Sequence, residues 1–145
     1  MHEQLKERIK QHEGFRRTVY LDSLGKRTVG YGHLCVEDHW EDGKEYDKEY
    51  LDKIFDQDFQ NAFDQCQNFC NEHDLDITET ATEVLIEMIF QLGIGNVGKF
   101  RRMIAALQDK DYEVASLEML DSKWAEQTPA RAEELSLIMK DAENN

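Results

Sequence analysis

One uninterrupted amphipathic segment in the middle of the chain constrains the fold more than any other feature. It follows Asp47, a residue type that favours the position just before a helix. Its apolar residues recur at every third or fourth position, at Leu51, Ile54, Phe55, Phe59, Ala62, Phe63, Cys66, Phe69 and Cys70. This spacing predicts a single helix over 47–71, about 25 residues long. In a small domain a helix of this length often connects two lobes, with its apolar stripe packed against both.

The segment before this helix has two different patterns. Leu5 and Ile9 lie four residues apart and predict a first helix over residues 2–12, ended by Gly14. Between residues 15 and 34, β-branched and aromatic residues flank the turn sequence SLGK and alternate with glycines. This pattern predicts a small antiparallel hairpin or meander.

The residues after the long helix have the pattern of a helical bundle. Four helices are predicted there from apolar repeats and capping residues. They are a buried helix with a capping box at Thr80 and Glu83 and an end at Gly93, a helix near 98–108, one from Asp111 to Trp124, and one that begins with Thr128 and Pro129. By contrast, the acidic stretch 37–46 is typical of a surface loop.

Together these elements predict a mostly helical α+β fold with two lobes. A small antiparallel hairpin lobe over 13–46 is expected to be joined by the helix over 47–71 to a helical-bundle lobe. That second lobe would consist of residues 1–12 and 72–145. A chain of 145 residues suits one such domain and is long enough to bury a core without disulfide bonds.

Composition excludes several classes of protein. No apolar run approaches the roughly 20 residues that cross a bilayer, so no membrane partner is expected. The net charge of −14 argues against a nucleic-acid partner. The N-terminus lacks the apolar core of a secretory signal, which predicts a cytoplasmic chain unless another system exports it. The three cysteines, Cys35, Cys66 and Cys70, are therefore expected to be reduced thiols.

The charge is distributed unevenly along the chain. The first 34 residues carry seven Lys or Arg against four Asp or Glu, a net charge of +3, whereas the remaining 111 residues carry −17. The opening segment is therefore a locally basic region of an acidic chain, which would suit an anionic ligand there, although solubility is the simpler interpretation for most of these charges.

The sequence GIGNVG at 93–98 matches the glycine pattern of dinucleotide-binding loops without their context. That pattern is meaningful after a strand and within a βαβ unit, and here it follows a predicted helix. We interpret it as a helix-to-helix connection that uses the conformational freedom of glycine.

The sharpest chemical candidate is a pair of carboxylates in the glycine-rich segment 12–33. Glu13 is predicted at the C-terminal end of a helix, where the helix dipole disfavours its anion. Asp22 is predicted in the hairpin turn, among hydroxyl and amide groups that favour its ionised form. Two carboxyl groups with opposed proton affinities suit glycoside hydrolysis, which needs one proton donor and one anion. Thr28, across the turn, could help Asp22 to hold a water molecule.

Two separated blocks of the sequence resemble one protein family. The first block is the pattern HEG-x-R-x-x-x-Y-x-D-x-x-G-x-x-T-x-G-x-GH from His12 to His33. The second comprises IFQLG at 89–93, the helix with Phe100, Met103 and Leu107, and EMLDSKWAEQTPARA at 118–132. Both blocks, in this order, resemble the phage-type lysozymes of glycoside hydrolase family 24, especially the lysozymes of T-even phages. The resemblance covers nearly the whole chain.

The resemblance implies a muramidase, which hydrolyses the β-1,4 bond between N-acetylmuramic acid and N-acetylglucosamine in peptidoglycan with inversion. Glu13 would be the general acid, and Asp22 and Thr28 would position the attacking water. The spacings from Glu13, nine residues to Asp22 and fifteen to Thr28, are those of the family. Bacterial peptidoglycan is the expected partner of a monomeric enzyme that needs no metal, nucleotide or other cofactor.

The same resemblance assigns roles to six further residues. Three match positions that contact the substrate, namely Leu34, Phe90 and, more weakly, Gln91. Arg131 matches an arginine that neighbours the catalytic acid. His33 and Asp58 match a structural ion pair, which agrees with the simpler interpretation of His33 as a residue that stabilises the join between the lobes.

The chain departs from the T-even lysozymes at several positions. Met103 and Glu118 replace a serine and an asparagine that line the cleft, and Glu87 replaces an asparagine in the buried helix. The connection between His33 and the long helix is shorter. The acidic charge of the chain contrasts with the basic T-even enzymes, so we expect the opposite dependence of rate on ionic strength.

Two other functions stay open. A lytic transglycosylase uses one catalytic glutamate and forms an anhydro-sugar without water. A non-catalytic peptidoglycan-binding or virion protein could keep the same fold. Asp22 and Thr28 favour hydrolysis over both alternatives. For an endolysin without a visible signal peptide, release from the host cytoplasm to the cell wall through a holin-type pore is expected.

Overall fold

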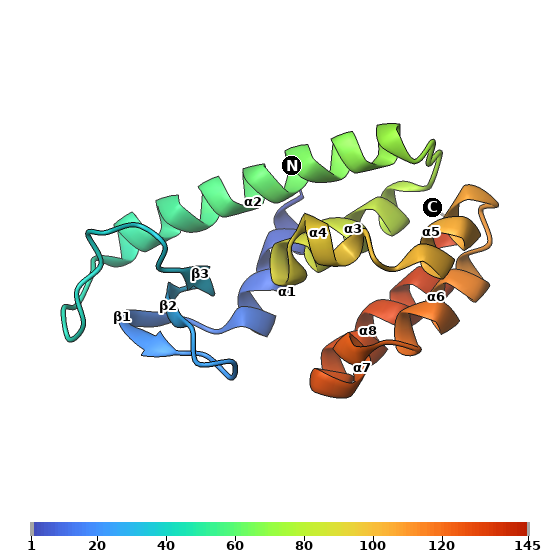
Figure 1. Ribbon diagram of the computed structural model, residues 1–145. Helices are drawn as coiled ribbons and strands as arrows, with labels where there is room; N and C mark the ends of the chain where they lie inside the picture. The colour runs from blue at the N-terminus through green and yellow to red at the C-terminus, as the bar shows by residue number, and fades with distance from the viewer. Residues whose placement is uncertain (1, 145) are drawn as a thin grey trace. The chain divides into compact units, whose positions relative to one another are not determined.

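The computed structural model describes residues 2–144, and Figure 1 shows the course of the chain. The chain divides into two compact units, residues 1–61 and 62–145. The division falls inside the long helix α2 (Lys48–Glu72), which matches the helix predicted over 47–71 to within one residue at each end. Residues 1–12 fall in the first unit, and their grouping with the later helices stays a prediction.

The first unit begins with helix α1 (Glu3–Glu13), which is shifted by one residue from its predicted range. Its buried positions are the two apolar residues one turn apart, Leu5 and Ile9. Gly14 follows the helix with φ of 72°, a left-handed conformation that glycine adopts readily, and its N–H donates to the carbonyl oxygen of Lys10. Glu13 is therefore the last helical residue, as predicted.

A three-stranded antiparallel sheet follows, in the order β1-β2-β3, which confirms the predicted meander (Figure 1). The strands are β1 (Arg16–Leu21), β2 (Arg27–Gly30) and β3 (His33–Leu34). Thr28 of β2 pairs with Tyr20 of β1 on one side and with Leu34 of β3 on the other. Between the pairs Arg16–Gly30 and Tyr20–Thr28, three residues of β1 face one residue of β2, so β1 contains a bulge.

The stretch 37–46 does more than form a surface loop, and the expectation for it was incomplete. Trp40 and Tyr46 are buried and form a small core with Val29 of the sheet and Leu51 of α2. Their polar atoms have partners within the loop: the Trp40 Nε1–H donates to Glu37 at 2.7 Å, and the Tyr46 hydroxyl accepts from a backbone N–H at 2.8 Å. Because these polar groups are satisfied, the acidic loop can bury two aromatic rings.

The second unit consists of helices, which confirms the predicted bundle. After the end of α2 they are α3 (Glu79–Leu92), α4 (Ile94–Val97), α5 (Arg101–Gln108), α6 (Tyr112–Leu120), α7 (Lys123–Gln127), α8 (Pro129–Lys140) and the 3-10 turn Ala142–Asn144. Helix α6 packs on both α5 and α8, and α3 packs on α8. The buried residues of these helices form the core of the unit, with α3 contributing an almost continuous buried segment from Val84 to Ile89.

Three helix boundaries in this unit differ from the sequence-based expectation. Thr78, not Thr80, caps α3, and its hydroxyl accepts from the backbone N–H of Ala81 at 3.2 Å. The helix predicted from Asp111 to Trp124 is broken at Ser122, which caps α7 with its own side chain. The sequence GIGNVG connects helices, as interpreted, but it also contains the single turn of α4.

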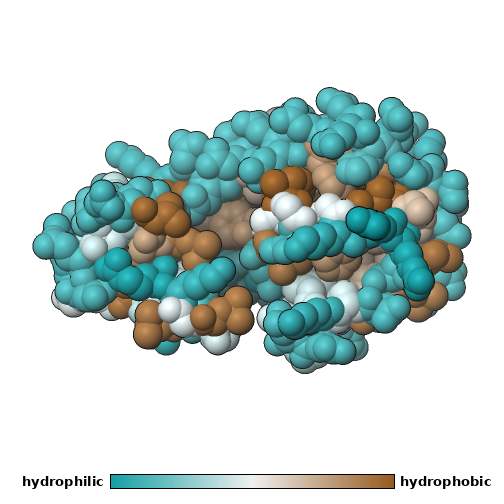
Figure 2. All heavy atoms as spheres, viewed as in Figure 1, coloured by the Kyte–Doolittle hydropathy of each residue, from teal (hydrophilic) through white to brown (hydrophobic). Residues whose placement is uncertain are grey.

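Polar side chains dominate the face shown in Figure 2, with apolar residues in separate groups. Four exposed apolar residues of the first unit lie on or beside the sheet, at Leu21, Leu24, Leu34 and Val36, and Tyr50 of α2 is exposed as well. No helix of the described chain combines the length and the apolar character that spanning a membrane requires. Cys35, Cys66 and Cys70 all carry free thiols.

Candidate active site

Glu13 lies at the end of α1 and against the turn that follows β2. Gly32 occupies that turn with φ of 75°. A Cβ atom at Gly32 would lie only 2.5 Å from Oε1 of Glu13, which is closer than real Cβ contacts allow. The carboxyl group of Glu13 therefore packs directly on the glycine backbone, and the C-terminal end of α1 adds its partial negative charge beside it.

Asp22 is held by its own turn. Its Oδ1 accepts hydrogen bonds from the backbone N–H groups of Leu24 at 2.9 Å and Lys26 at 2.8 Å. The backbone of Asp22 also pairs with Lys26, because its N–H donates to the Lys26 carbonyl oxygen at 2.9 Å. Within residues 2–144 no hydrogen bond involves Oδ2. The turn thus fixes one oxygen of the carboxylate and leaves the other able to accept a proton or a hydrogen bond.

Thr28 and Leu34 lie next to each other on one face of the sheet. Side chains of directly paired residues on antiparallel strands point to the same face, so the row Tyr20–Thr28–Leu34 shares one surface. Thr28 is 3% exposed, and its hydroxyl donates to the carbonyl oxygen of Lys26 at 3.0 Å. The hydroxyl oxygen can still accept a hydrogen bond, for instance from water. Leu34 is 42% exposed and can make apolar contact with a ligand.

Tyr20 is a neighbour of both candidate carboxylates. Burial is the main cause that raises the pKa of its phenol, and the negative charges of Glu13 and Asp22 raise it further. The Arg16 guanidinium, which lies over the ring at 4.7 Å from its centroid, acts in the opposite direction on that pKa. Glu13 and Asp22 therefore both lie within electrostatic range of one phenol whose strand partner is Thr28.

His33 forms the predicted pair with Asp58, and it has a second carboxylate partner. Its Nδ1 lies 2.8 Å from Oδ2 of Asp58, and its Nε2 lies 2.9 Å from Oε1 of Glu37. Burial alone would lower the pKa of His33, but the hydrogen bonds to both carboxylates outweigh it and raise the value to about 9. The pKa of Glu37 falls to about 2, chiefly through its hydrogen bond with His33. With both ring nitrogens occupied, His33 is a structural residue that fixes β3 to α2.

The remaining candidate residues belong to the second unit. Phe90 and Gln91 are half-buried residues near the end of α3. The side-chain oxygen of Gln91 accepts a hydrogen bond from Nε1 of Trp124 at 2.9 Å, and its Nε2 lies 3.5 Å from the hydroxyl of Thr128. Gln91 therefore ties α3 to α7, through Trp124, and to Thr128 before α8, in addition to any contact with substrate.

Arg131 has a partner that the sequence did not indicate. Its Nε and Nη2 both lie 3.0 Å from Oε2 of Glu87, and the two side chains are 9% and 0% exposed. The carboxylate at position 87 thus does not stand alone in the buried helix α3, because the guanidinium from α8 compensates its charge.

Sequence reasoning assigned no role to three residues of these networks: Tyr20, Glu37 and Glu87. Tyr20 had a usable signal, because it stands inside the motif two residues before Asp22, near the end of the predicted strand that leads into the turn. Glu37 lies four residues after His33 without regular secondary structure, so its spacing was uninformative. Glu87 pairs across 44 residues, a separation that no local pattern reveals.

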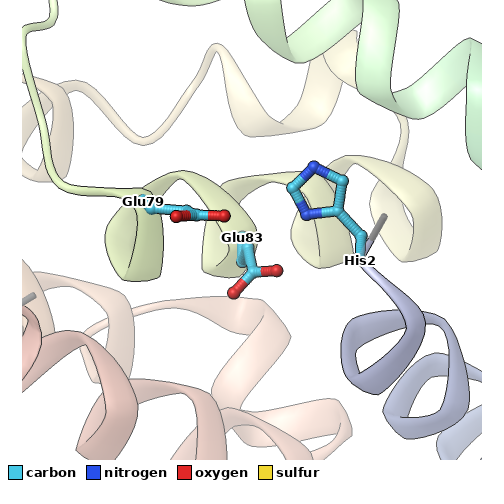
Figure 3. A group of neighbouring side chains, drawn as sticks. All are labelled: His2, Glu79 and Glu83. Carbon is cyan, nitrogen blue, oxygen red and sulfur yellow. The ribbon is translucent and has the colours of Figure 1, made fainter.

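Glu79 and Glu83 are potential metal ligands among the described residues. Figure 3 shows Glu79 and Glu83 on the first turns of α3, one turn apart, together with His2 from the first unit. Two carboxylates at this spacing are common on solvated helix faces, and Ca²⁺ or Mg²⁺ sites use more oxygen ligands than the pair provides. We assign the pair no function.

The chain matches the family model described as phage lysozyme over residues 10–137. It belongs to the phage lysozyme family. The match includes Glu13, Asp22 and Thr28 in the first unit as well as Phe90, Gln91 and Arg131 in the second. The resemblance expected from the sequence is thereby confirmed, and the fold is the α+β fold of phage lysozymes.

Individual relatives also support membership of the phage lysozyme family. The chain is 26% identical over 154 residues to the pre-baseplate central spike protein Gp5 of Enterobacteria phage T4, with 92% of this chain and 27% of that protein aligned. It is 24% identical to "Probable T4-type lysozyme 2" of Dictyostelium discoideum, with 88% of each aligned. It is 32% identical to peptidoglycan hydrolase gp36 of Pseudomonas phage phiKMV, with 86% of this chain and 14% of that protein aligned. The chain thus spans a minor part of the two phage relatives and most of the Dictyostelium one.

Proposed function

We propose that this phage lysozyme family member is a peptidoglycan hydrolase, and more specifically a muramidase that inverts the anomeric configuration. The observation that carries the proposal is the grouping in the first unit. Glu13 and Asp22 act electrostatically on the same phenol, and the strand partner of that phenol is Thr28. The names of two relatives, a T4-type lysozyme and a peptidoglycan hydrolase, favour peptidoglycan as the substrate.

In the proposed reaction Glu13 acts as the general acid. It donates its proton to the glycosidic oxygen as the bond from that oxygen to the anomeric carbon breaks. Asp22 and Thr28 hold a water molecule on the opposite side of the sugar. That water adds to the anomeric carbon and passes a proton to Asp22, whose free Oδ2 supports this role. The inverting route expects carboxyl groups roughly 6.5 to 9.5 Å apart in the substrate complex.

The substrate-binding roles of Leu34, Phe90 and Gln91, and the supporting role of Arg131, belong to the same proposal. The exposure of Leu34 on the face of Thr28 favours its role. Release to the cell wall through a holin-type pore is proposed for a chain that acts as an endolysin.

Mass spectrometry of digested peptidoglycan tests the reaction. Hydrolysis gives fragments with a reducing end and one added water, whereas a lytic transglycosylase gives anhydro-sugars. Glu13→Gln and Asp22→Asn should abolish product formation, and Glu7→Gln, on the same helix but exposed, should leave it unchanged. Full activity of Glu13→Gln contradicts the assigned acid, and tight glycan binding without any product supports a non-catalytic protein.

Proton NMR of the earliest product tests the stereochemistry. Inversion of a β-linked substrate gives the α-anomer first, before mutarotation mixes the two forms. Initial formation of the β-anomer indicates a retaining route and overturns the role of Asp22 and Thr28 as holders of water.

A further inference from the structure

Tyr20 lies on the face of the sheet that carries the proposed water site. Its Cα pairs with Thr28, and Thr28 pairs in turn with Leu34. Asp22 follows Tyr20 by two residues along the chain, at the start of the turn that holds its carboxylate. The phenol therefore lies beside the residues to which water positioning and substrate contact are assigned.

The guanidinium of Arg16 lies over the ring of Tyr20. The bulge in β1 falls between these two residues, and the Arg16 guanidinium carbon lies 4.7 Å from the ring centroid. Bulges often re-aim side chains near active sites, and a cation over a tyrosine ring is attracted by its π electrons. Within residues 2–144 Arg16 forms no ion pair, so its guanidinium is not drawn away from the ring by a carboxylate.

The hydroxyl of Tyr20 is a neutral hydrogen-bond donor within electrostatic range of the carboxylates of Glu13 and Asp22. Burial, followed by the charge of Glu13, raises its pKa above the usual value of 10, so the O–H stays protonated at any pH at which the enzyme works. No hydrogen bond ties this hydroxyl to another residue in the described part of the chain. A glycan offers hydroxyl, ring and acetamido oxygens as acceptors, and a neutral donor can bind them without adding charge near the two carboxylates.

We propose that Tyr20 contacts the glycan directly, donating a hydrogen bond from its phenol to the sugar bound beside Thr28, while Arg16 acts as a positioning residue that holds the ring. This inference rests on the proposed function, because it takes peptidoglycan glycan as the ligand.

The test removes the hydroxyl and keeps the ring. Tyr20→Phe should lower kcat/KM on solubilised peptidoglycan by about tenfold or more, because a hydrogen bond to substrate is lost. In the inactive Glu13→Gln background, calorimetry with purified glycan strands should show binding weakened by about tenfold in the Tyr20→Phe double variant. Tyr50→Phe is the matched control, since it removes an exposed phenol of the same unit whose hydroxyl lies 3.0 Å from His39.

A second variant tests the positioning role. Arg16→Leu should weaken glycan binding and kcat/KM by several-fold at an unchanged thermal midpoint, and Arg16→Lys, which keeps a cation over the ring, should recover most of the loss. This pair also keeps the test decisive where Tyr20→Phe fails to fold.

The outcomes separate this inference from the proposed function. Wild-type activity and binding in Tyr20→Phe, alongside an inactive Glu13→Gln, overturn the role of Tyr20 and leave the muramidase proposal standing. Full activity in Glu13→Gln overturns the proposed function itself. Equal binding by Arg16→Leu and the wild type overturns the positioning role of Arg16.

Discussion

Asp22 and His33 each take part in two side-chain hydrogen bonds, with different consequences for their chemistry. Both bonds of Asp22 end on one oxygen and come from its own turn, so the other oxygen stays open. The two bonds of His33 use both ring nitrogens, so the ring has no nitrogen left for a reaction. The distribution of partners over the atoms, more than their number, distinguishes a candidate catalytic group from a structural one.

The charge pair at His33 makes stability depend on pH. Because the folded chain raises the pKa of His33 from 6.5 to about 9, this contribution is complete below pH 6.5 and is lost as the pH rises toward 9. The shift corresponds to a contribution of at most about 3 kcal/mol to the free energy of unfolding, for a side chain that is 13% exposed. Urea unfolding at pH 6 and pH 9.5 should show this loss in the wild type and its absence in His33→Asn.

His39→Asn serves as the control for that experiment, because it replaces an exposed histidine of the same loop region. It should keep the wild-type difference between the two pH values. The pKa of Glu37, lowered from 4.5 to about 2, predicts a separate loss of stability as the pH falls below 4.5. If the free energy of unfolding depends on pH in the same way in the wild type and in His33→Asn, the assignment of this pH dependence to His33 is contradicted.

Gly32 is a position where a single added methyl group is expected to change both activity and stability. In Gly32→Ala the new methyl group would collide with the carboxyl group of Glu13, so activity should fall at least about tenfold. The positive φ adds a stability cost of about 1 kcal/mol. Gly43→Ala shares the positive φ with nothing within 4 Å of the added Cβ, so it should lose stability and keep activity. Initial lysis rates and thermal midpoints measure both effects.

At the scale of helices and strands, the sequence predicted which elements exist better than where they begin. The periodicity of α2 and the glycine after α1 depend on neighbouring residues only, and both were predicted to within one residue. The start of α3 also involves a distant residue, because the N–H of Thr78 donates to the hydroxyl of Tyr112, which lies 34 residues away. Thr78, two residues before the predicted cap at Thr80, therefore has this contact in addition to its local cap on Ala81.

The residues of the candidate site also differ in whether the sequence alone could predict them. Glu13, Asp22 and Thr28 could be chosen from the sequence because one short motif contains all of them. Glu87 and Arg131 meet through the packing of α3 on α8, which no motif encodes. Residues in contact across helices become predictable only when the helix packing is known.

The pair Glu87–Arg131 should behave as a unit that connects α3 with α8. Glu87→Leu and Arg131→Met should each destabilise the fold by about 3 kcal/mol, because each leaves a buried charge without this partner. The double variant should lose about 1 to 3 kcal/mol less than the two single variants combined. A double-mutant cycle by urea unfolding measures this coupling, and additive losses would show that the contact contributes no coupling energy.

For the molecule as a whole, net charge would govern the proposed encounter with an anionic cell wall. A chain of net charge −14 is repelled by such a surface at low salt, so its lysis rate should rise as salt increases from about 10 to 150 mM. Turbidity loss of permeabilised Gram-negative cells measures the rate. A variant with Asp109→Lys and Glu113→Lys, at two exposed positions outside the proposed site, should show a weaker dependence. A rate that falls with salt contradicts this account.

The boundary between the two compact units also affects how proteases would cut the chain. Neighbouring units are often separated by an exposed linker, where nicking concentrates, but here residues 61 and 62 lie in the interior of α2. A protease needs an extended, accessible backbone, and a helix interior does not offer one. Limited trypsin digestion followed by mass spectrometry should therefore nick the loop around Lys44 before it cuts within α2, so the two halves should not be released as separate fragments.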